Sequence, residues 1–330
     1  MNVEIKNVSD LGRELSFTVE KEIVAKEQDD IVASLRRDAV VEGFRKGKVP
    51  AEIITTRFMD TIREHLIRRI VPKFLTQVVR EKGMMTVGEP EIFDVKMDEN
   101  GMAFKAYTEI KPEVRVSKYA GLTLKKAERQ PVTDERVEQV LSEWEKKPEF
   151  AASVIDPEKR KAWKEKILGQ LEYYAETEAV AKEEEQLWNQ LLEQESFPLP
   201  EKLVRERATR FMEDQLRRMN LEGKSQEEIE KIAREIFEKV KPAAEREIRK
   251  YFVLDCIAEQ EKIVPGEQEI EERIVRLGRI TGDPVDQMRE KLSESGKIAD
   301  IIEDIRLDKA FVFVKEKAVI SRIVMPGESA

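Results

Sequence analysis

The sequence contains few residues of the types that catalyse reactions or bind metals. Its only histidine, His65, lies in IREHLIRR between apolar positions, and its only cysteine, Cys256, lies in the apolar segment YFVLDCIA. A catalytic histidine relay or a zinc site would need partners that this pattern does not supply. We therefore predict a structural or surface role for His65, a buried structural thiol at Cys256 and no metal site.

Nucleotide chemistry and paired-carboxylate catalysis are also disfavoured. Neither GxxxxGK[ST] nor GxGxxG occurs, so the glycine loops that bring backbone N–H groups to phosphates are missing. The many carboxylates stand in runs such as KEEEQ and EQEIEER, which are typical of solvated helix faces. With 38% charged and only 6% aromatic residues, the composition favours long solvated helices over an enzyme with an aromatic pocket.

The segment GFRKGKVP, residues 43–50, is the most informative one. Two glycines and a proline are expected to fix the shape of an interhelical loop, with one aromatic and three cations at its tip. Phe44 can anchor in an apolar pocket, while Arg45, Lys46 and Lys48 can pair with phosphates or acidic side chains. The alternative is a solvated loop in which Phe44 packs into the local core. The residues alone leave both interpretations open.

The distribution of charge favours docking on an anionic partner. The net charge is −9, but residues 36–82 contain 12 Lys or Arg and 6 Asp or Glu, so this segment carries +6 and the rest −15. A locally cationic surface is what a phosphate backbone attracts. Aromatic RNA-reading motifs are absent, so we do not expect sequence-specific RNA binding.

The elements that would position this loop form an α+β domain over residues 1–111. Alternating apolar residues predict two strands within residues 2–24, and EPEIFDVKM and MAFKAYTEI predict two more. Apolar spacing predicts a helix from Glu27 to Val41 and a second helical region that Pro72 should bend or split. The expected order is ββααββ.

The remainder is predicted to be a linker and a helical body. Residues 112–156 are rich in proline and should be an extended linker with one short helix, whose apolar residues are Val137, Val140, Leu141 and Trp144. Residues 157–330 should be mainly α-helical, starting from the N-cap Asp156 and interrupted by FPLP. Further helices are expected after the capping box of Ser225 and Glu228, with a kink at Pro242, and from Glu267, Asp283 and Lys297.

In this setting GFRKGKVP, followed by IITTRF, resembles the ribosome-binding signature of the trigger factor family. The resemblance extends to PEVRV and resumes in ESFPLPEKLVRERATRFMEDQL and IIEDIRLDKAFVFVKEKAVI. It implies an α+β ribosome-binding domain, an extended linker and an elongated α-helical chaperone body. The family normally inserts an FKBP-like prolyl isomerase domain after the linker, but here KKPEFAASVIDPEK leads straight into helix. We therefore expect a variant without that domain.

The resemblance also implies a function and partners. It implies an ATP-independent chaperone that docks near the peptide exit of the ribosome and transiently holds nascent or unfolded polypeptides. The implied partners are a large-subunit protein at the tunnel exit, nearby ribosomal RNA, unfolded chains and, for the free protein, a second copy. No cofactor is implied. No run of 18 apolar residues and no signal-peptide pattern occurs, so we expect a cytoplasmic protein without membrane contact.

Two sets of site residues are expected, the first from the resemblance and the second from apolar side chains that the helical body should leave on its surface after its core is packed. The expected ribosome-binding residues belong to one loop and are Phe44, Arg45 and Lys46, with Gly43, Gly47, Lys48 and Pro50. The expected client-binding residues lie on one helix and are Phe211, Met212, Leu216 and Met219, with the segment from Val312 to Val324 as a further candidate. For this second set, packing of helix against helix is the alternative.

Two other functions remain as rivals. One is a ribosome-associated assembly or stability factor that docks in the same way but holds no clients. The other is a prolyl isomerase with an unrecognised active site.

Overall fold

The computed structural model describes most of the chain, namely residues 2–98, 100–127, 129–146, 157–194 and 196–321. Backbone contacts divide the chain into two compact units. One comprises Met1–Glu113 with Phe197–Ile248, and the other Val114–Ser196 with Arg249–Ala330. Each unit thus combines segments that are far apart in the sequence. The predicted domain boundaries at residues 111 and 156 stay a prediction.

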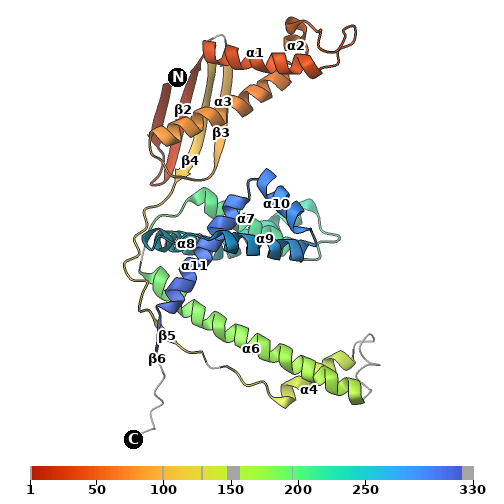
Figure 1. The fold of residues 1–330 in the computed structure, drawn as a ribbon, viewed down its shortest axis with the longest axis vertical. Coiled ribbons are helices and arrows are strands. Elements are labelled where there is room, and N and C mark those ends of the chain that lie inside the picture. Colours follow the sequence, from red (N-terminus) through yellow and green to blue (C-terminus); the bar gives the residue numbers. More distant parts are fainter. Residues whose placement is uncertain (1, 99, 128, 147–156, 195, 322–330) are drawn as a thin grey trace. The chain divides into compact units, whose positions relative to one another are not determined.

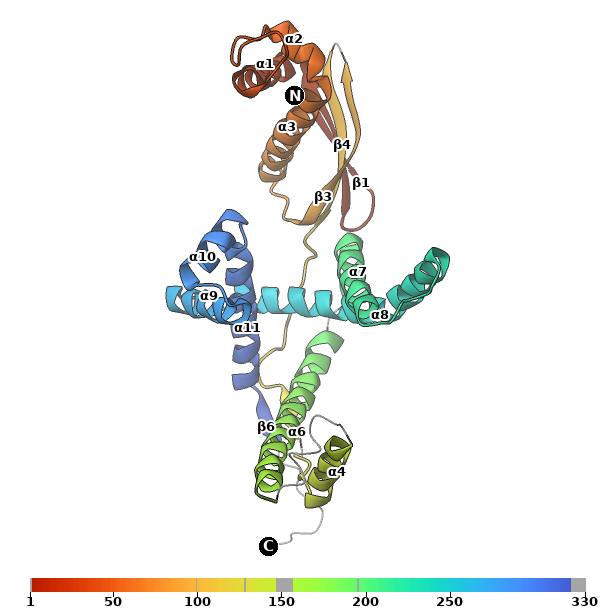
Figure 2. The same ribbon diagram turned by 90° about the vertical axis from the view of Figure 1, so that its right-hand side faces the viewer.

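The first unit contains a four-stranded antiparallel sheet with helices on one face (Figure 1 and Figure 2). The strand order is β1-β2-β4-β3. Phe17 and Phe104 pair across two central strands and stack with ring centroids 4.5 Å apart. Their face of the sheet is buried by apolar residues of the long helices. The elements are β1 (Asn2–Asn7), β2 (Gly12–Glu20), α1 (Lys21–Asp38), α2 (Ala51–Arg57), α3 (Met59–Glu81), β3 (Thr86–Asp98) and β4 (Gly101–Ile110).

The α+β class is confirmed, but two details of this unit differ from expectation. Helix α1 begins at Lys21 because β2 pairs with β4 only as far as Glu20, opposite Gly101, where the partner strand starts. Helix α3 continues through Pro72, which was expected to bend or split it. Buried residues of α3 lie on both sides of this proline, and burying each contributes about 1.5–3 kcal/mol. Their sum exceeds the ~3 kcal/mol that an interior proline costs.

Two further helices belong to the first unit: α7 (Glu201–Arg217) and the part of α8 (Gln226–Gln260) up to Ile248. The predicted break at FPLP is confirmed. The capping box is confirmed too, since the Ser225 N–H donates to Glu228 Oε2 (2.8 Å) and the Glu228 N–H donates to Ser225 Oγ (3.3 Å). Helix α8 continues through Pro242.

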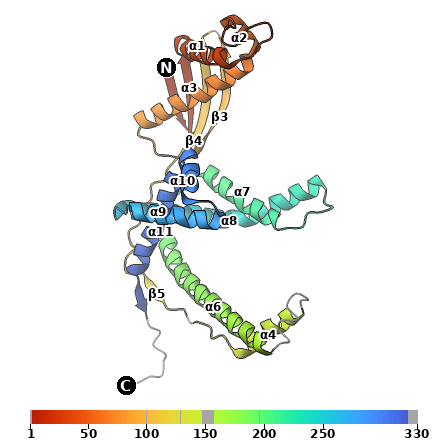
Figure 3. The same ribbon diagram turned by 45° about the vertical axis from the view of Figure 1, so that its right-hand side comes forward.

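The second unit contains a helical hairpin made by α4 (Asp134–Glu145) and the N-terminal part of α6 (Pro157–Glu193) (Figure 3). Val137, Leu141 and Ile167 are buried between the two helices, and Trp144 and Trp163 meet edge to face with centroids 5.3 Å apart. The short helix predicted within the linker is therefore confirmed as α4. The predicted N-cap Asp156 lies outside the described residues.

The rest of the second unit contains the end of α8, whose Tyr251 and Asp255 contact Glu303 and Arg306 of a later helix, and further elements. The elements are β5 (Thr123–Lys125), α9 (Glu267–Thr281), α10 (Val285–Glu294), α11 (Ile298–Glu316) and β6 (Val319–Ser321). Helices α9 to α11 share an apolar cluster that includes Ile274, Met288 and Ile301. Helix α11 reaches α6 through Phe311, which stacks on Trp188 with centroids 4.5 Å apart. The three helix starts predicted after residue 266 are confirmed.

Two kinds of feature are missing from the part of the chain that the structure describes. None of its helices combines the length and the apolar character that crossing a bilayer requires. Within the same residues, no group of three or more His, Cys, Asp or Glu side chains is arranged to hold a metal ion.

Candidate functional site

The loop between α1 and α2, residues 39–50, is anchored in the core at two points. Val41 and Val49 are buried in the apolar cluster that covers the sheet. Between them, every residue except the half-buried Gly47 is exposed. The loop therefore has fixed ends and an exposed tip.

Two consecutive turns shape the tip. The Phe44 N–H donates to the Val41 carbonyl (N···O 3.1 Å), and the Lys48 N–H donates to the Arg45 carbonyl (2.9 Å). The third residue of each turn is a glycine with positive φ, 86° for Gly43 and 79° for Gly47. Among described non-glycine residues, positive φ occurs only at Asp94 and Lys262, so the second position of each turn has ordinary φ. Both turns are thus of type II, which requires glycine or asparagine at this third position.

The side chains at the tip face solvent. Phe44 is 40% exposed, which excludes the alternative in which its ring is buried in the local core. Arg45, Lys46 and Lys48 are exposed as well. Lys46 has a loose ion pair with Asp38 (3.9 Å) between two exposed side chains, and such a pair contributes little. The loop thus presents one aromatic ring and three cations to solvent.

The ends of the adjoining helices extend this cationic surface. Arg36 and Arg37 in the last turn of α1 and Arg57 in the last turn of α2 are exposed. Between residues 36 and 57 the sequence has six Lys or Arg and three Asp or Glu. Net positive charge is therefore concentrated where the aromatic ring is exposed.

An ion pair between helices helps to hold α1, and with it the start of the loop. Lys73 Nζ of α3 donates to Glu27 Oε1 of α1 (2.9 Å), and Arg69 lies 3.9 Å from the other carboxylate oxygen. The hydrogen bond from Lys73 lowers the pKa of Glu27. Together with the apolar contacts of Ile31 and Val32, this pairing fixes α1 against α3.

The predicted client-binding residues of α7 are only partly available. Phe211 and Met212 pack against the buried Ala208, Val240 and Ala244 between α7 and α8. Leu216 is half-buried near the end of α7, whereas Met219, which was expected on the same helix, lies two residues beyond its end and is exposed. The structure therefore places two of the four in helix packing and one on the surface. In the segment predicted from Val312, the exposed residues include Val312, Val319 and Ile320, while residues 322–324 lie outside the described part.

The middle of α6 carries an apolar surface that the sequence did not single out. Tyr173 and Tyr174 are 70% and 67% exposed, and their rings lie 6.2 Å apart. From its helical spacing alone, Tyr174 would continue the packed stripe of Trp163, Ile167 and Leu171. It does not, because α4 packs only against the N-terminal part of α6. The sequence did contain a signal for this surface. Neighbouring residues on a helix face different directions, so two adjacent tyrosines cannot both point into one helix interface.

The predictions for His65 and Cys256 are confirmed. His65 is exposed on α3. Cys256 is buried in α8, and its thiol donates to the Val114 carbonyl (S···O 3.3 Å).

Comparisons with known proteins match both ends of the chain to one family. The model described as bacterial trigger factor protein matches residues 1–144, and that described as its C-terminus matches residues 161–316. Residues 145–160 lie between them. A trigger factor of Desulfotalea psychrophila is 29% identical over 47% of this chain and 35% of its own length. One of Citrifermentans bemidjiense is 32% identical over 38% and 29%, so these matches span about a third of each relative.

Other matches cover the whole chain at lower identity. A trigger factor of Opitutus terrae is 22% identical over 99% of this chain and 100% of its own length. A solved structure described in terms of promiscuous substrate recognition by the trigger factor chaperone is 15% identical, covers 96% of this chain and 100% of that one, and has a TM-score of 0.53. This likeness concerns the fold.

Proposed function

This chain belongs to the trigger factor family, and we propose that it is an ATP-independent chaperone that docks on the ribosome near the peptide exit. Once docked, it transiently holds nascent or unfolded polypeptides. One observation carries the docking part: the α1–α2 loop presents Phe44 and three exposed cations on a frame of two type II turns. This frame reduces the ordering that binding would otherwise require.

The chemistry of the loop fits a ribosomal protein with RNA beside it. An exposed aromatic ring serves as an anchor in an apolar pocket, and such central anchors dominate binding energies. Arg45, Lys46 and Lys48 suit acidic side chains or phosphates around that pocket. The excess of cations at this end attracts the ribosome over a distance of about a Debye length, ~8 Å at physiological salt. Docking should therefore weaken as salt rises.

Client holding is supported by exposed apolar side chains on the helices. Tyr173, Tyr174 and Met219 are exposed; methionine is flexible enough to fit varied partners, and tyrosine offers a large apolar ring with a polar hydroxyl. A client that buries about 200 Å² of apolar surface gains ~5 kcal/mol before binding costs, which suits transient contacts. Release follows when the client buries the same surface in its own core.

We further propose that the chain acts without prolyl isomerisation, in the cytoplasm, and that the free protein forms a homodimer. Only residues 145–160 separate the two segments that match the family, far fewer than the ~50 residues of a small domain. Sedimentation of the free protein over a range of concentrations tests the dimer.

Two assays test the proposal. The purified chain is cosedimented with empty and translating ribosomes and, separately, mixed with a denatured protein whose aggregation is followed by light scattering. The proposal expects ribosome binding and suppressed aggregation without ATP. Ribosome binding without any effect on aggregation would favour the assembly or stability factor, and absence of both would refute the proposal.

A further inference from the structure

Strand β5 is held along one edge by side chains rather than by a strand. Gln190 of α6 accepts from the Thr123 N–H (3.1 Å) and donates to the Thr123 carbonyl (2.8 Å). Gln186 makes the same pair of hydrogen bonds with Lys125, both at 2.9 Å. Each glutamine thus reproduces the two bonds that a residue of a neighbouring strand would make.

The spacing of helix and strand explains why this works. Residues four apart on a helix are separated by about 6.0 Å along its axis. Alternate residues of a strand are separated by about 6.6 Å. Gln186 and Gln190 therefore match Lys125 and Thr123, whose backbone groups point to the same side. These bonds involve no β5 side chain, so α6 holds β5 in an extended form through its backbone alone.

The opposite edge of β5 is covered by β6, a short strand close to the end of the chain. The pairing is parallel and joins three residues, with Thr123 opposite Val319 and Lys125 opposite Ser321. The Val319 N–H donates to the Leu122 carbonyl (2.8 Å). Val319 and Ile320 are 58% and 60% exposed, so their side chains add little burial. A pairing only three residues long, with little burial of its apolar side chains, is a weak attachment, because each backbone bond replaces one to water.

We propose that this edge of β5 is a client-binding site, at which an extended apolar segment of an unfolded polypeptide displaces β6 and adds as a parallel strand. The proposal rests on the chaperone function proposed above and specifies one mode of client recognition. Strand β6 itself shows what fits: an extended segment held by its backbone, with the β-branched residues Val319 and Ile320 in its first two positions. Addition of a strand to a sheet edge is a general mode of peptide recognition and depends little on sequence.

The arrangement suits weak and reversible binding. Because Gln186 and Gln190 hold the far edge and Leu122 is buried, β5 keeps its extended form after β6 leaves. The client therefore binds to a strand that is already extended, and the free-energy cost of ordering β5 does not reduce the affinity. While β6 covers the edge, a client cannot bind there. The apparent affinity for the client is therefore the intrinsic affinity multiplied by the fraction of molecules in which β6 has left. Return of β6 also expels the client.

A pair of proline variants tests the mechanism. Val319→Pro removes the N–H that donates to Leu122 and should open the edge. Ile320→Pro is the matched control, since backbone groups alternate along a strand and the Ile320 N–H points away from β5. The two side chains are almost equally exposed, so loss of burial is similar.

The probe is a fluorescein-labelled peptide with the sequence KAVIS of residues 317–321 between glycine–serine ends, followed by fluorescence anisotropy. We expect Val319→Pro to bind it about fivefold or more tightly than wild type, and Ile320→Pro to resemble wild type. A control peptide with proline in place of valine should bind neither of the two variants. Equal affinity of Val319→Pro and wild type, or the same gain in both variants, would overturn the proposal.

Hydrogen exchange of the wild-type protein gives a test that needs no variant. When a permanently unfolded protein such as reduced, carboxymethylated α-lactalbumin binds, the Val319 amide should exchange faster while those of Thr123 and Lys125 stay protected. An unchanged Val319 amide in a demonstrated complex refutes strand displacement. Aggregation suppression by the same wild-type sample is measured in parallel, so failure of this mode is distinguished from failure of the chaperone function.

Discussion

At the scale of single residues, the two glycines of the α1–α2 loop determine how its tip is presented. Gly43 and Gly47 have φ of 86° and 79°, and an added Cβ at either would meet no atom within 4 Å. A substitution there is disfavoured by the backbone conformation alone and not by crowding. The sequence predicted that these glycines shape the loop, and the structure shows that they do so through two type II turns.

Gly47→Ala should therefore strain the loop without disturbing the core. A left-handed conformation costs a non-glycine residue about 1–2 kcal/mol, so the free energy of unfolding of the first unit should fall by up to this amount. Ribosome affinity should also fall several-fold, because the tip is less well ordered. Gly169→Ala is the control: Gly169 lies within α6 with open space around it, and alanine should stabilise the helix by ~0.5–1 kcal/mol. Denaturant unfolding measures the stability of each variant, and cosedimentation measures its ribosome affinity. Equal effects of the two changes would contradict the turn assignment.

The exposed tyrosines of α6 give a second prediction at this scale. Replacing Tyr173 and Tyr174 together by alanine should weaken client binding about tenfold, since each ring that buries ~100 Å² contributes ~2.5 kcal/mol before binding costs. The Tyr→Phe double variant keeps the apolar surface and should behave like wild type. The measurement is the concentration of each variant that halves the aggregation of a denatured client. If the alanine variant is as effective as wild type, this surface does not hold clients.

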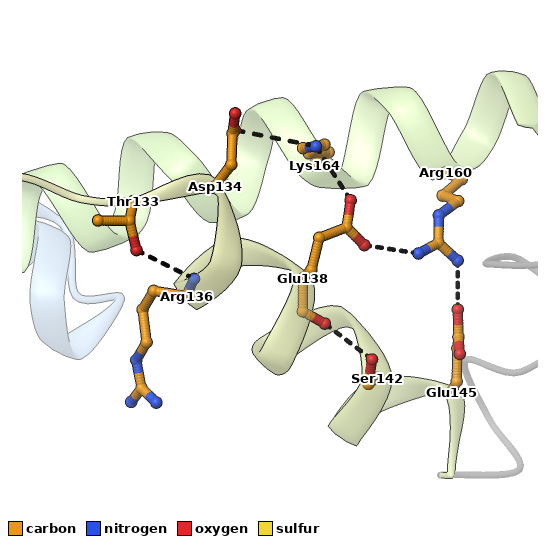
Figure 4. A network of polar contacts seen from close by, with 8 residues as sticks. All are labelled: Thr133, Asp134, Arg136, Glu138, Ser142, Glu145, Arg160 and Lys164. Atoms are coloured by element: carbon orange, nitrogen blue, oxygen red, sulfur yellow. Dashed lines mark hydrogen bonds and ion pairs between the residues drawn. The ribbon is translucent and has the colours of Figure 1, made fainter.

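At the scale of elements, the α4–α6 hairpin combines apolar packing with an exposed ion network (Figure 4). Glu138 of α4 accepts from Lys164 (3.0 Å) and Arg160 (2.7 Å) of α6, and Arg160 also pairs with Glu145. The hydrogen bond from Lys164, followed by that from Arg160, lowers the pKa of Glu138. Since all of these side chains are partly exposed, solvent and salt should screen the network.

Glu138→Gln should slightly destabilise the hairpin at neutral pH. A carboxyl whose pKa is lower in the folded state stabilises that state fully above its unfolded pKa of about 4.3, and this contribution is lost as pH falls through the folded pKa. The difference from wild type should thus vanish in acid and shrink in ~1 M salt, where the Debye length is ~3 Å. Tryptophan fluorescence reports it, since Trp144 and Trp163 lie in the hairpin. Glu135→Gln, outside these pairs, is the control, and an acid-insensitive difference would contradict the account.

The sequence predicted elements well where their patterns are local. Apolar spacing and caps located most helices, and the loop motif was visible as a string of residue types. The start of α1 was missed because the end of β2 is determined by where its partner β4 begins. The roles of Gln186 and Gln190 were missed because both are uncharged polar residues of a long helix and their partners lie more than 60 residues away. Long-range pairing of this kind leaves no local trace.

At the scale of the whole molecule, the two segments that match the family lie close together in the sequence. The matched segments leave only residues 145–160 between them, and the helical hairpin lies at this point of the chain. We predict no acceleration of a proline-limited refolding phase, whose time constant is tens of seconds without a catalyst. The assay compares this chain with a true prolyl isomerase at equal concentration. A comparable acceleration would show that an active site exists.

The central claim is that the tip of the α1–α2 loop docks the chain on the ribosome. The most direct test is cosedimentation of the Phe44→Ala, Arg45→Ala, Lys46→Ala triple variant with empty ribosomes, which carry no client, after circular dichroism has confirmed its fold. Losing a central anchor commonly costs ~2 kcal/mol or more, and a factor of ten in affinity corresponds to about 1.4 kcal/mol. The variant should therefore bind at least tenfold more weakly.

A control triple variant at the end of α7, with Arg217, Arg218 and Met219 replaced by alanine, loses two exposed cations and one apolar side chain and should bind like wild type. If the folded loop variant cosediments as well as wild type does, the loop is not the docking site.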